Sequence, residues 1–155
     1  MARVYSGATG LTLFTFRGDA AGDNLGWSVR NAGDVNGDGW LDVMAGAHLS
    51  DVHGSNSGMA RIWSGQDGSV LHTLYGTDAD DWFGWAVGDL GDLDADGYAD
   101  IGVGATYDDS VGTDAGKIFV YSFGGVGTPP IYQHRGSPCQ TSTGTLPRIE
   151  VGGHE

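Results

Sequence analysis

The chain carries the nonapeptide "DVNGDGWLD" at residues 34–42 and a close copy of it, "DLDADGYAD", at residues 92–100. The two loops are 58 residues apart, and the same spacing extends beyond them. Residues 1–58 and 59–116 align without a gap and are identical at 24 positions. Self-similarity at a fixed period of this length is the signature of a repeat architecture. We therefore predict that the chain is built from tandem copies of one structural unit.

Each period contains short segments rich in branched and aromatic residues and bounded by Gly and Asp, near residues 26–32, 41–47, 59–64 and 69–75. This composition is typical of β-strands, and no long stretch keeps its apolar residues at helical spacing. Four short strands per repeat form the blade of a β-propeller. The predicted fold is all-β, with about two and a half propeller-type blades, each full blade being a four-stranded antiparallel sheet.

The phase of the repeat predicts where the blades begin and end. The propeller region is expected at residues 1–136, with a half blade at 1–16 and full blades at 25–75 and 83–134. Residues 137–155 contain two prolines and a Ser/Thr/Gly run. This composition is typical of a tail or linker.

Composition restricts the kind of partner. The formal net charge is −13, with 20 acidic residues, 7 basic residues and 29 glycines. A nucleic acid is excluded as a partner because a phosphate backbone requires a basic patch. No apolar run is long enough to cross a bilayer, so membrane insertion is not expected. No signal-peptide pattern is visible at Met1, and the single Cys139 excludes an internal disulfide framework.

The acidic loops are candidate calcium sites, because oxygen-bearing groups recur at alternate loop positions. The predicted ligands of the first loop are the side chains of Asp34, Asn36, Asp38 and Asp42 and the Trp40 carbonyl. Those of the second loop are the side chains of Asp92, Asp94, Asp96 and Asp100 and the Tyr98 carbonyl. A cluster of oxygen ligands suits the hard cation Ca²⁺, and carboxylates held together without a cation repel one another.

Two alternatives to this interpretation are a solvated acidic turn and an EF-hand. An EF-hand requires Glu at the twelfth loop position and helices on both sides. Ala45 and Val103 occupy that position here, and both flanks are predicted strands. The calcium interpretation is favoured over a solvated turn because two loops in register carry oxygen at every side-chain ligand position.

These motifs resemble an FG-GAP repeat, as in the propeller of integrin α subunits. The matching segments are "LG" at 25–26, "GDVNGDGWLD" at 33–42 and "GAH" at 46–48, then "FG" at 83–84, "GDLDADGYAD" at 91–100 and "GAT" at 104–106. The resemblance covers roughly residues 1–136 and implies propeller blades with Ca²⁺ on the loop joining the first two strands of each blade. The departures are Leu25 for Phe, and His48 and Thr106 for Pro. None of them is a predicted calcium ligand.

The function expected from these features is structural or adhesive. We expect a secreted or cell-surface module that binds a protein or glycan. The alternative is a calcium-dependent propeller hydrolase of the esterase or phosphoesterase type, with His48, His53 and Asp51 as a conceivable cluster. Catalysis is less expected than binding, because no nucleophile–base motif is visible. Trp27 and Trp85 occupy equivalent positions, where filling the space between blades is favoured over stacking on a sugar.

Assembly follows from the number of blades. Two and a half blades cannot close a ring, and an incomplete ring leaves strand edges and apolar faces uncovered. The chain is expected to be a homo-oligomer that completes a ring, or else part of a longer chain.

Overall fold

The computed structural model describes residues 1–124 and 132–135, and within them every regular element is a strand. The strands are β1 (Ala2–Tyr5), β2 (Thr12–Phe16), β3 (Ser28–Gly33), β4 (Asp42–Ala47), β5 (Met59–Trp63), β6 (Val70–Tyr75), β7 (Phe83–Gly91), β8 (Asp100–Ala105), β9 (Lys117–Tyr121) and β10 (Tyr132–Arg135). No membrane-spanning helix is present in this part of the chain. The tail predicted at 137–155 lies outside the described residues.

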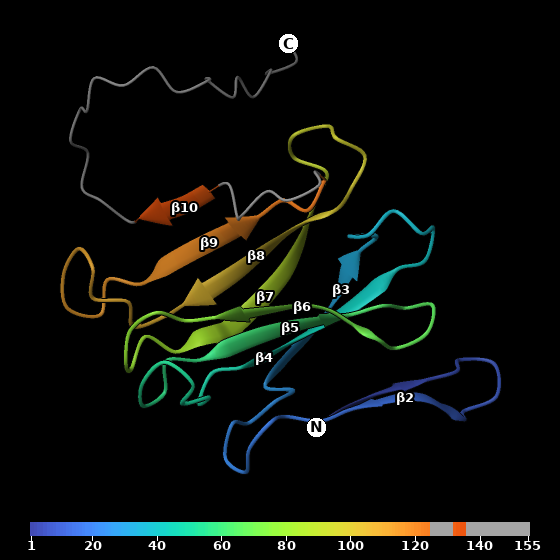
Figure 1. The fold of residues 1–155 in the computed structure, drawn as a ribbon, viewed down its shortest axis with the longest axis horizontal. Helices are drawn as coiled ribbons and strands as arrows, with labels where there is room; N and C mark the ends of the chain where they lie inside the picture. Colours follow the sequence, from blue (N-terminus) through green and yellow to red (C-terminus); the bar gives the residue numbers. More distant parts are fainter. Residues whose placement is uncertain (125–131, 136–155) are drawn as a thin grey trace.

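The strands form two four-stranded antiparallel sheets and a separate hairpin (Figure 1). The first sheet has the strand order β3-β4-β5-β6, and the second has the equivalent order β7-β8-β9-β10. Strands β3 to β6 lie within two residues of the predicted segments. The predicted all-β fold of propeller-type sheets is confirmed.

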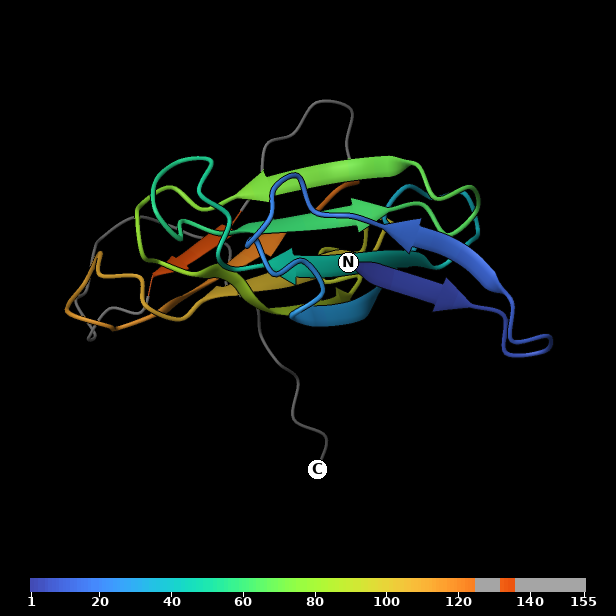
Figure 2. The same ribbon diagram turned by 90° about the horizontal axis from the view of Figure 1, so that it is seen from below.

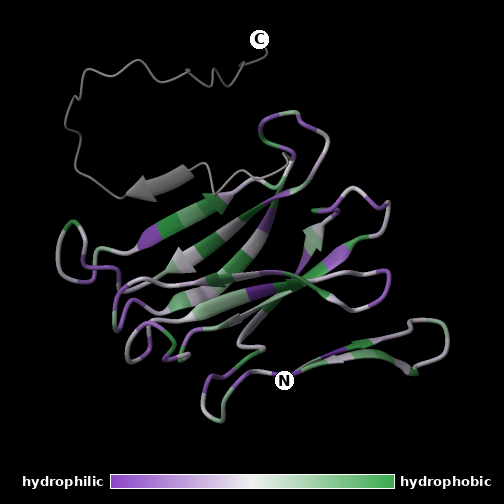
Figure 3. Cartoon of the chain, in the orientation of Figure 1, coloured by the Kyte–Doolittle hydropathy of each residue, from purple (hydrophilic) through white to green (hydrophobic). Residues whose placement is uncertain are grey.

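The hydrophobic core lies between the two sheets. Its largest fully buried side chains include Met44 and Ile62 from the first sheet and Phe83 and Ile101 from the second. Figure 3 shows hydrophobic residues concentrated on the strands and hydrophilic residues mainly in the loops. Because the buried cluster draws on both sheets, neither sheet forms a core alone.

The hairpin β1–β2 packs against the other face of the first sheet, as Figure 2 shows. The ring of Phe16 stacks on that of Trp63 with 4.4 Å between centroids, and Ala2 and Leu25 are buried in the same cluster. By the 58-residue period, β1 and β2 correspond to β5 and β6. The hairpin therefore consists of the two outer strands of a blade.

The first strand of the second sheet, β7, enters the interface at its first two residues, Phe83 and Gly84. Phe83 is fully buried, and its N–H donates to the Ser57 carbonyl at 3.2 Å. A Cβ atom added at Gly46 would lie 1.8 Å from the Gly84 carbonyl oxygen. The two backbones touch at this point, so the interface requires glycine at position 46.

We predict that Gly46→Ala lowers the free energy of unfolding by about 3 kcal/mol or more, because the clash is with backbone that cannot rotate away. Urea denaturation measures the change. Gly104→Ala is the matched control, since Gly104 holds the same position in β8 and a Cβ there meets nothing nearer than 3.7 Å. Equal losses in the two variants would contradict this account of the interface.

Candidate metal centre

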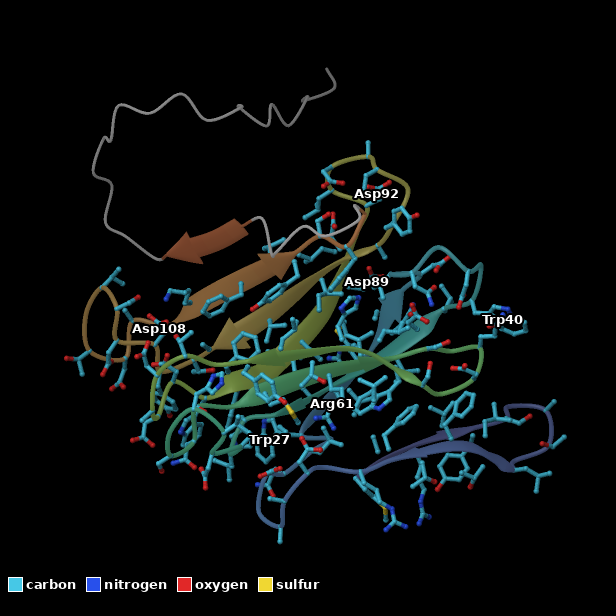
Figure 4. The ribbon with its side chains drawn as sticks, viewed as in Figure 1. Trp27, Trp40, Arg61, Asp89, Asp92 and Asp108 are labelled. Carbon is cyan, nitrogen blue, oxygen red and sulfur yellow. The ribbon has the colours of Figure 1, made fainter. Side chains whose placement is uncertain are left out.

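The two acidic loops occupy equivalent places in the fold. The first joins β3 to β4, and the second joins β7 to β8. Figure 4 shows Trp40 and Asp92 at one end of the sheets, with Asp108 at the opposite end. A shift of register between Asn31 and Gly33 precedes the first loop, and a shift between Asp89 and Gly91 precedes the second. Such bulges bend a strand at its end.

Backbone N–H groups hold the carboxylates in the same way in both loops. Asp34 accepts from the N–H groups of Asp38 and Gly39 at 3.1 and 2.9 Å. Asp92 accepts from those of Asp96 and Gly97 at 3.1 and 2.9 Å. The first carboxylate of each loop thus points inward and holds the backbone four and five residues further on.

The second loop brings three carboxylates to one point. Asp92, Asp94 and Asp100 each contribute an oxygen, and these oxygens lie within 4.8 Å of one another. Asp96, also a predicted ligand, is not in this group, and one of its oxygens accepts the Tyr98 N–H at 3.0 Å. The arrangement favours a cation at the centre of the three carboxylates.

In the first loop Asn36 takes the place of Asp94. Its Nδ2 donates to Asp38 Oδ2 at 2.9 Å, so the first loop has one carboxylate fewer and an internal hydrogen bond in its place. The last predicted ligand, Asp42, accepts the Val35 N–H at 3.0 Å and the Gly65 N–H at 3.0 Å. Both Asp42 oxygens are therefore satisfied without a cation.

Asp100 differs from Asp42 in one respect. Its Oδ2 accepts the Leu93 N–H at 2.6 Å, but its buried Oδ1 has no hydrogen-bond partner in the described part of the chain. Burial raises the pKa of Asp100, against the Leu93 N–H and the Ser122 hydroxyl, which lower it, and the nearby Asp94 and Asp96 carboxylates add to the rise. An unpaired buried carboxylate oxygen is costly unless a cation or donor meets it. The oxygen-only donor set fits a hard divalent cation.

Burial also raises the pKa of Asp42, against the hydrogen bonds from Gly65 and Val35, which lower it. The Asp38 and Asp34 carboxylates add to the rise. Both repeats thus hold a buried carboxylate at the ninth loop position. A bound cation would offset the repulsion between this carboxylate and its acidic neighbours.

One supporting residue was missed by the sequence analysis. Ser122, directly after β9, donates from Oγ to Asp94 Oδ2 at 3.0 Å. Its counterpart in the first repeat is Ser64, so the recurrence of serine after 58 residues is a sequence signal for this position. Sequence spacing alone does not reveal that the end of the third strand reaches the loop between the first two.

The histidines do not form the cluster considered above. His48 is buried, and its ring lies between those of Trp27, Trp82 and Trp85, with centroids 4.8 to 5.2 Å apart. Burial lowers the pKa of His48. The Nδ1 atom of His53 lies 2.9 Å from the Gly76 carbonyl oxygen. Neither histidine lines the cavity of about 410 Å³ beside Asp51.

The two equivalent tryptophans pack against each other. The ring centroids of Trp27 and Trp85 are 4.7 Å apart, and the residues come from successive sheets. This contact agrees with the favoured interpretation of filling space between blades, although Trp27 keeps 54% of its surface exposed.

The sequence model of the family described as "FG-GAP repeat" matches residues 25–63. The chain carries FG-GAP repeats. Residues 83–121 repeat the matched region in sequence and in strand order. The predicted resemblance to the FG-GAP propellers of integrin α subunits is thereby confirmed.

The chain is similar to integrin α subunits over most of its length. It is 38% identical to integrin alpha-6 of Homo sapiens over 122 residues, which are 74% of this chain and 10% of the relative. It is 31% identical to integrin alpha-V of Gallus gallus over 130 residues, or 79% and 12% of the two chains. Integrin alpha ina-1 of Caenorhabditis elegans is 30% identical over 157 residues, or 90% and 13%. The chain thus spans about a tenth of the length of these relatives.

The second FG-GAP repeat also holds a pair of buried carboxylates at the opposite end of the sheets. Burial, followed by the neighbouring Asp108 carboxylate, raises the pKa of Asp81 to about 6. Burial would also raise the pKa of Asp108, but hydrogen bonds from Lys117 and Ser110 outweigh it and hold that pKa below its ordinary value. Asp108 and Lys117 form a buried ion pair at 2.5 Å. Asp81 is the member of this group that favours its protonated form.

We predict that Asp81→Asn stabilises the fold at pH 8 and has little effect near pH 4. A carboxyl whose pKa is raised in the native state stabilises that state only while it is protonated, and this contribution is lost as the pH rises through about 6. The gain at pH 8 is up to about 3 kcal/mol, because one pKa unit corresponds to about 1.4 kcal/mol.

Urea denaturation at the two pH values measures the gain. Asp23→Asn is the control in the first FG-GAP repeat, because Asp23 is buried at the position equivalent to Asp81 while Ser50 stands in the place of Asp108. The assignment is wrong if Asp81→Asn has the same effect at both pH values.

Proposed function

We propose that this chain is a calcium-stabilised FG-GAP propeller module of a secreted or cell-surface protein, with a structural or adhesive role. Its relatives are integrin α subunits, which are adhesion receptors. The partner is proposed to be a protein or glycan. The observation that carries the calcium part of the proposal is the buried Asp100 Oδ1, which has no donor within the described residues and belongs to a cluster with Asp92 and Asp94.

The two loops should differ in affinity. Four carboxylates are available in the second loop and three in the first, where Asn36 replaces an aspartate. Ligand charge tunes calcium affinity. The second loop also begins with three oxygens already gathered and Asp94 oriented by Ser122, so less ordering is needed on binding.

We predict two calcium-binding events in calorimetry, with the tighter one in the second loop. Calcium should raise the melting temperature and EDTA should lower it, because the ion binds the native state. Asp94→Asn gives the second loop the same predicted side-chain ligands as the first, three aspartates and one asparagine. It should therefore weaken the tighter event to about the affinity of the weaker one.

Asp109→Asn is the control, since Asp109 is exposed and directly follows Asp108, which Figure 4 labels at the opposite end of the sheets. It removes the same charge and should leave both events unchanged. If wild-type protein takes up no calcium and EDTA does not shift its melting curve, the proposed calcium function is wrong.

We also propose that the open face of the second sheet docks another FG-GAP blade. A groove of about 490 Å³ runs between residues 104–106 and 115–118. The same surface of the first sheet, at Gly46 and Gly58, is occupied by Phe83–Gly84. Ile118 on the open face is 59% exposed, whereas its counterpart Ala60 is 1% exposed. The groove therefore matches an apolar–glycine turn.

A second copy of the chain is the proposed occupant, because it carries such a turn at Leu25–Gly26. Within each copy this turn lies against the hairpin β1–β2, where a Cβ at Gly26 would be 3.1 Å from the Met1 carbonyl oxygen. Docking in this way requires β9–β10 of one copy to replace β1–β2 of the other. The exchange is plausible physically because the hairpin pairs with no other strand among the described residues.

We predict that the wild-type chain forms concentration-dependent oligomers in light scattering. Gly104→Val should remain a monomer, because the new side chain projects into the groove, while its Cβ would meet nothing nearer than 3.7 Å. A cooperative melt of the variant establishes that its fold is retained. A wild-type monomer at all concentrations, or equal assembly of the variant, would contradict docking by a second copy.

A further inference from the structure

The two acidic loops touch each other directly. The N–H of Ala99 in the second loop donates to the Asp34 carbonyl oxygen in the first at 3.0 Å. A Cβ atom added at Gly37 would lie 2.7 Å from Cε1 of Tyr98, so the tyrosine ring covers the backbone of the first loop. A Cβ at Gly33 would lie 2.3 Å from the Ala99 Cβ. The loops approach this closely because glycine stands at position 33, at the end of β3, and at position 37 in the first loop.

The contact joins groups that matter to both sites. Asp34 is the first predicted ligand of its loop, and Gly37 lies between the predicted ligands Asn36 and Asp38. On the other side, the Tyr98 carbonyl is a predicted ligand of the second loop, and Ala99 directly precedes Asp100. When one loop becomes more rigid, the contact therefore also restrains the backbone that carries predicted ligands in the other loop.

Among the described residues, Trp40 and Leu41 of the first loop do not lie against another acidic loop. Trp40 and Leu41 are the counterparts of Tyr98 and Ala99, and they are 57% and 66% exposed. Tyr98, in contrast, is partly buried. The chain thus supplies its own comparison, with one aromatic residue that bridges two loops and one at the same position that does not.

We infer that Tyr98 and Ala99 are positioning residues for the first loop, and that through them cation binding to one loop strengthens binding to the other. The inference rests on the proposed calcium binding. A cation in the second loop draws Asp92, Asp94 and Asp100 together and orders Tyr98 and Ala99 between them. The first loop, held at Asp34 and Gly37, then loses less conformational entropy when it binds its own cation.

Electrostatics opposes this coupling. The first cation reduces the negative charge that attracts the second, but salt screens that effect between exposed groups. The packing contact is not screened. Coupling should therefore be positive at physiological ionic strength and should become more favourable as salt is raised.

The test follows each loop separately during a calcium titration of the full chain. The backbone amide signals of Gly39 and Gly97 in NMR spectra report the first and second loop. The double variant Asp92→Asn/Asp94→Asn weakens the second site while keeping oxygen acceptors for the loop N–H groups. We expect it to weaken calcium binding to the first loop by about five-fold or more, the low end of typical coupling.

Tyr98→Ala should weaken calcium binding to the first loop by a similar factor and reduce the further effect of the double variant, because only the Ala99 contact then joins the loops. Leu41→Ala is the control, since Leu41 is an exposed residue of the first loop that is not a predicted ligand. It should leave the affinity of the second loop unchanged within about two-fold, far below a typical coupling. Reciprocity is also required, so disabling the first loop with Asp38→Asn must weaken the second by the same factor that the second imposes on the first.

The outcomes separate this inference from the proposed function. If neither glycine signal responds to calcium, the proposed calcium binding fails. If both respond but Tyr98→Ala lowers only the melting temperature and leaves the affinity of the first loop unchanged, Tyr98 is a packing residue and the coupling is refuted.

Discussion

The structure depends on one contact, in which the start of β7 at Phe83–Gly84 lies against the backbone of the first sheet. The Gly84 carbonyl leaves no room for a side chain at position 46, and the Phe83 ring is buried in the core between the sheets. Because neither sheet has a core of its own, this contact fixes how the repeats are stacked. It also sets β3 beside β7, which places the two acidic loops at the same end of the sheets, within hydrogen-bonding distance of each other.

The acidic loops introduce an electrostatic constraint into that arrangement. Each holds a buried carboxylate at its last ligand position, Asp42 or Asp100, whose charged form is disfavoured by burial and by neighbouring carboxylates. Backbone N–H groups offset part of this cost in the first loop but leave Asp100 Oδ1 unpaired in the described structure. A divalent cation would relieve the repulsion, and the proposed calcium dependence of the fold follows from this difference.

Much of the fold was predictable because two copies of the repeat carry the same pattern of strands and loops. The 58-residue period located β3 to β6, and the spacing of aspartates located the loops. The period did not reveal that Ala99 bonds to Asp34 or that Ser122 holds Asp94, because these contacts depend on how sheets stack and where the third strand ends. The isolation of His48 from His53 was likewise a result of packing, since the tryptophans that enclose His48 come from distant positions.

The most direct test of the central claim is a crystal structure of the chain grown with calcium, with anomalous scattering used to locate the ions. The account predicts two ions, one in each loop, bound at about 2.3–2.6 Å by the aspartate and asparagine oxygens and by the Trp40 and Tyr98 carbonyls. Loops without an anomalous peak at saturating calcium, or ions bound only elsewhere on the acidic surface, would contradict it.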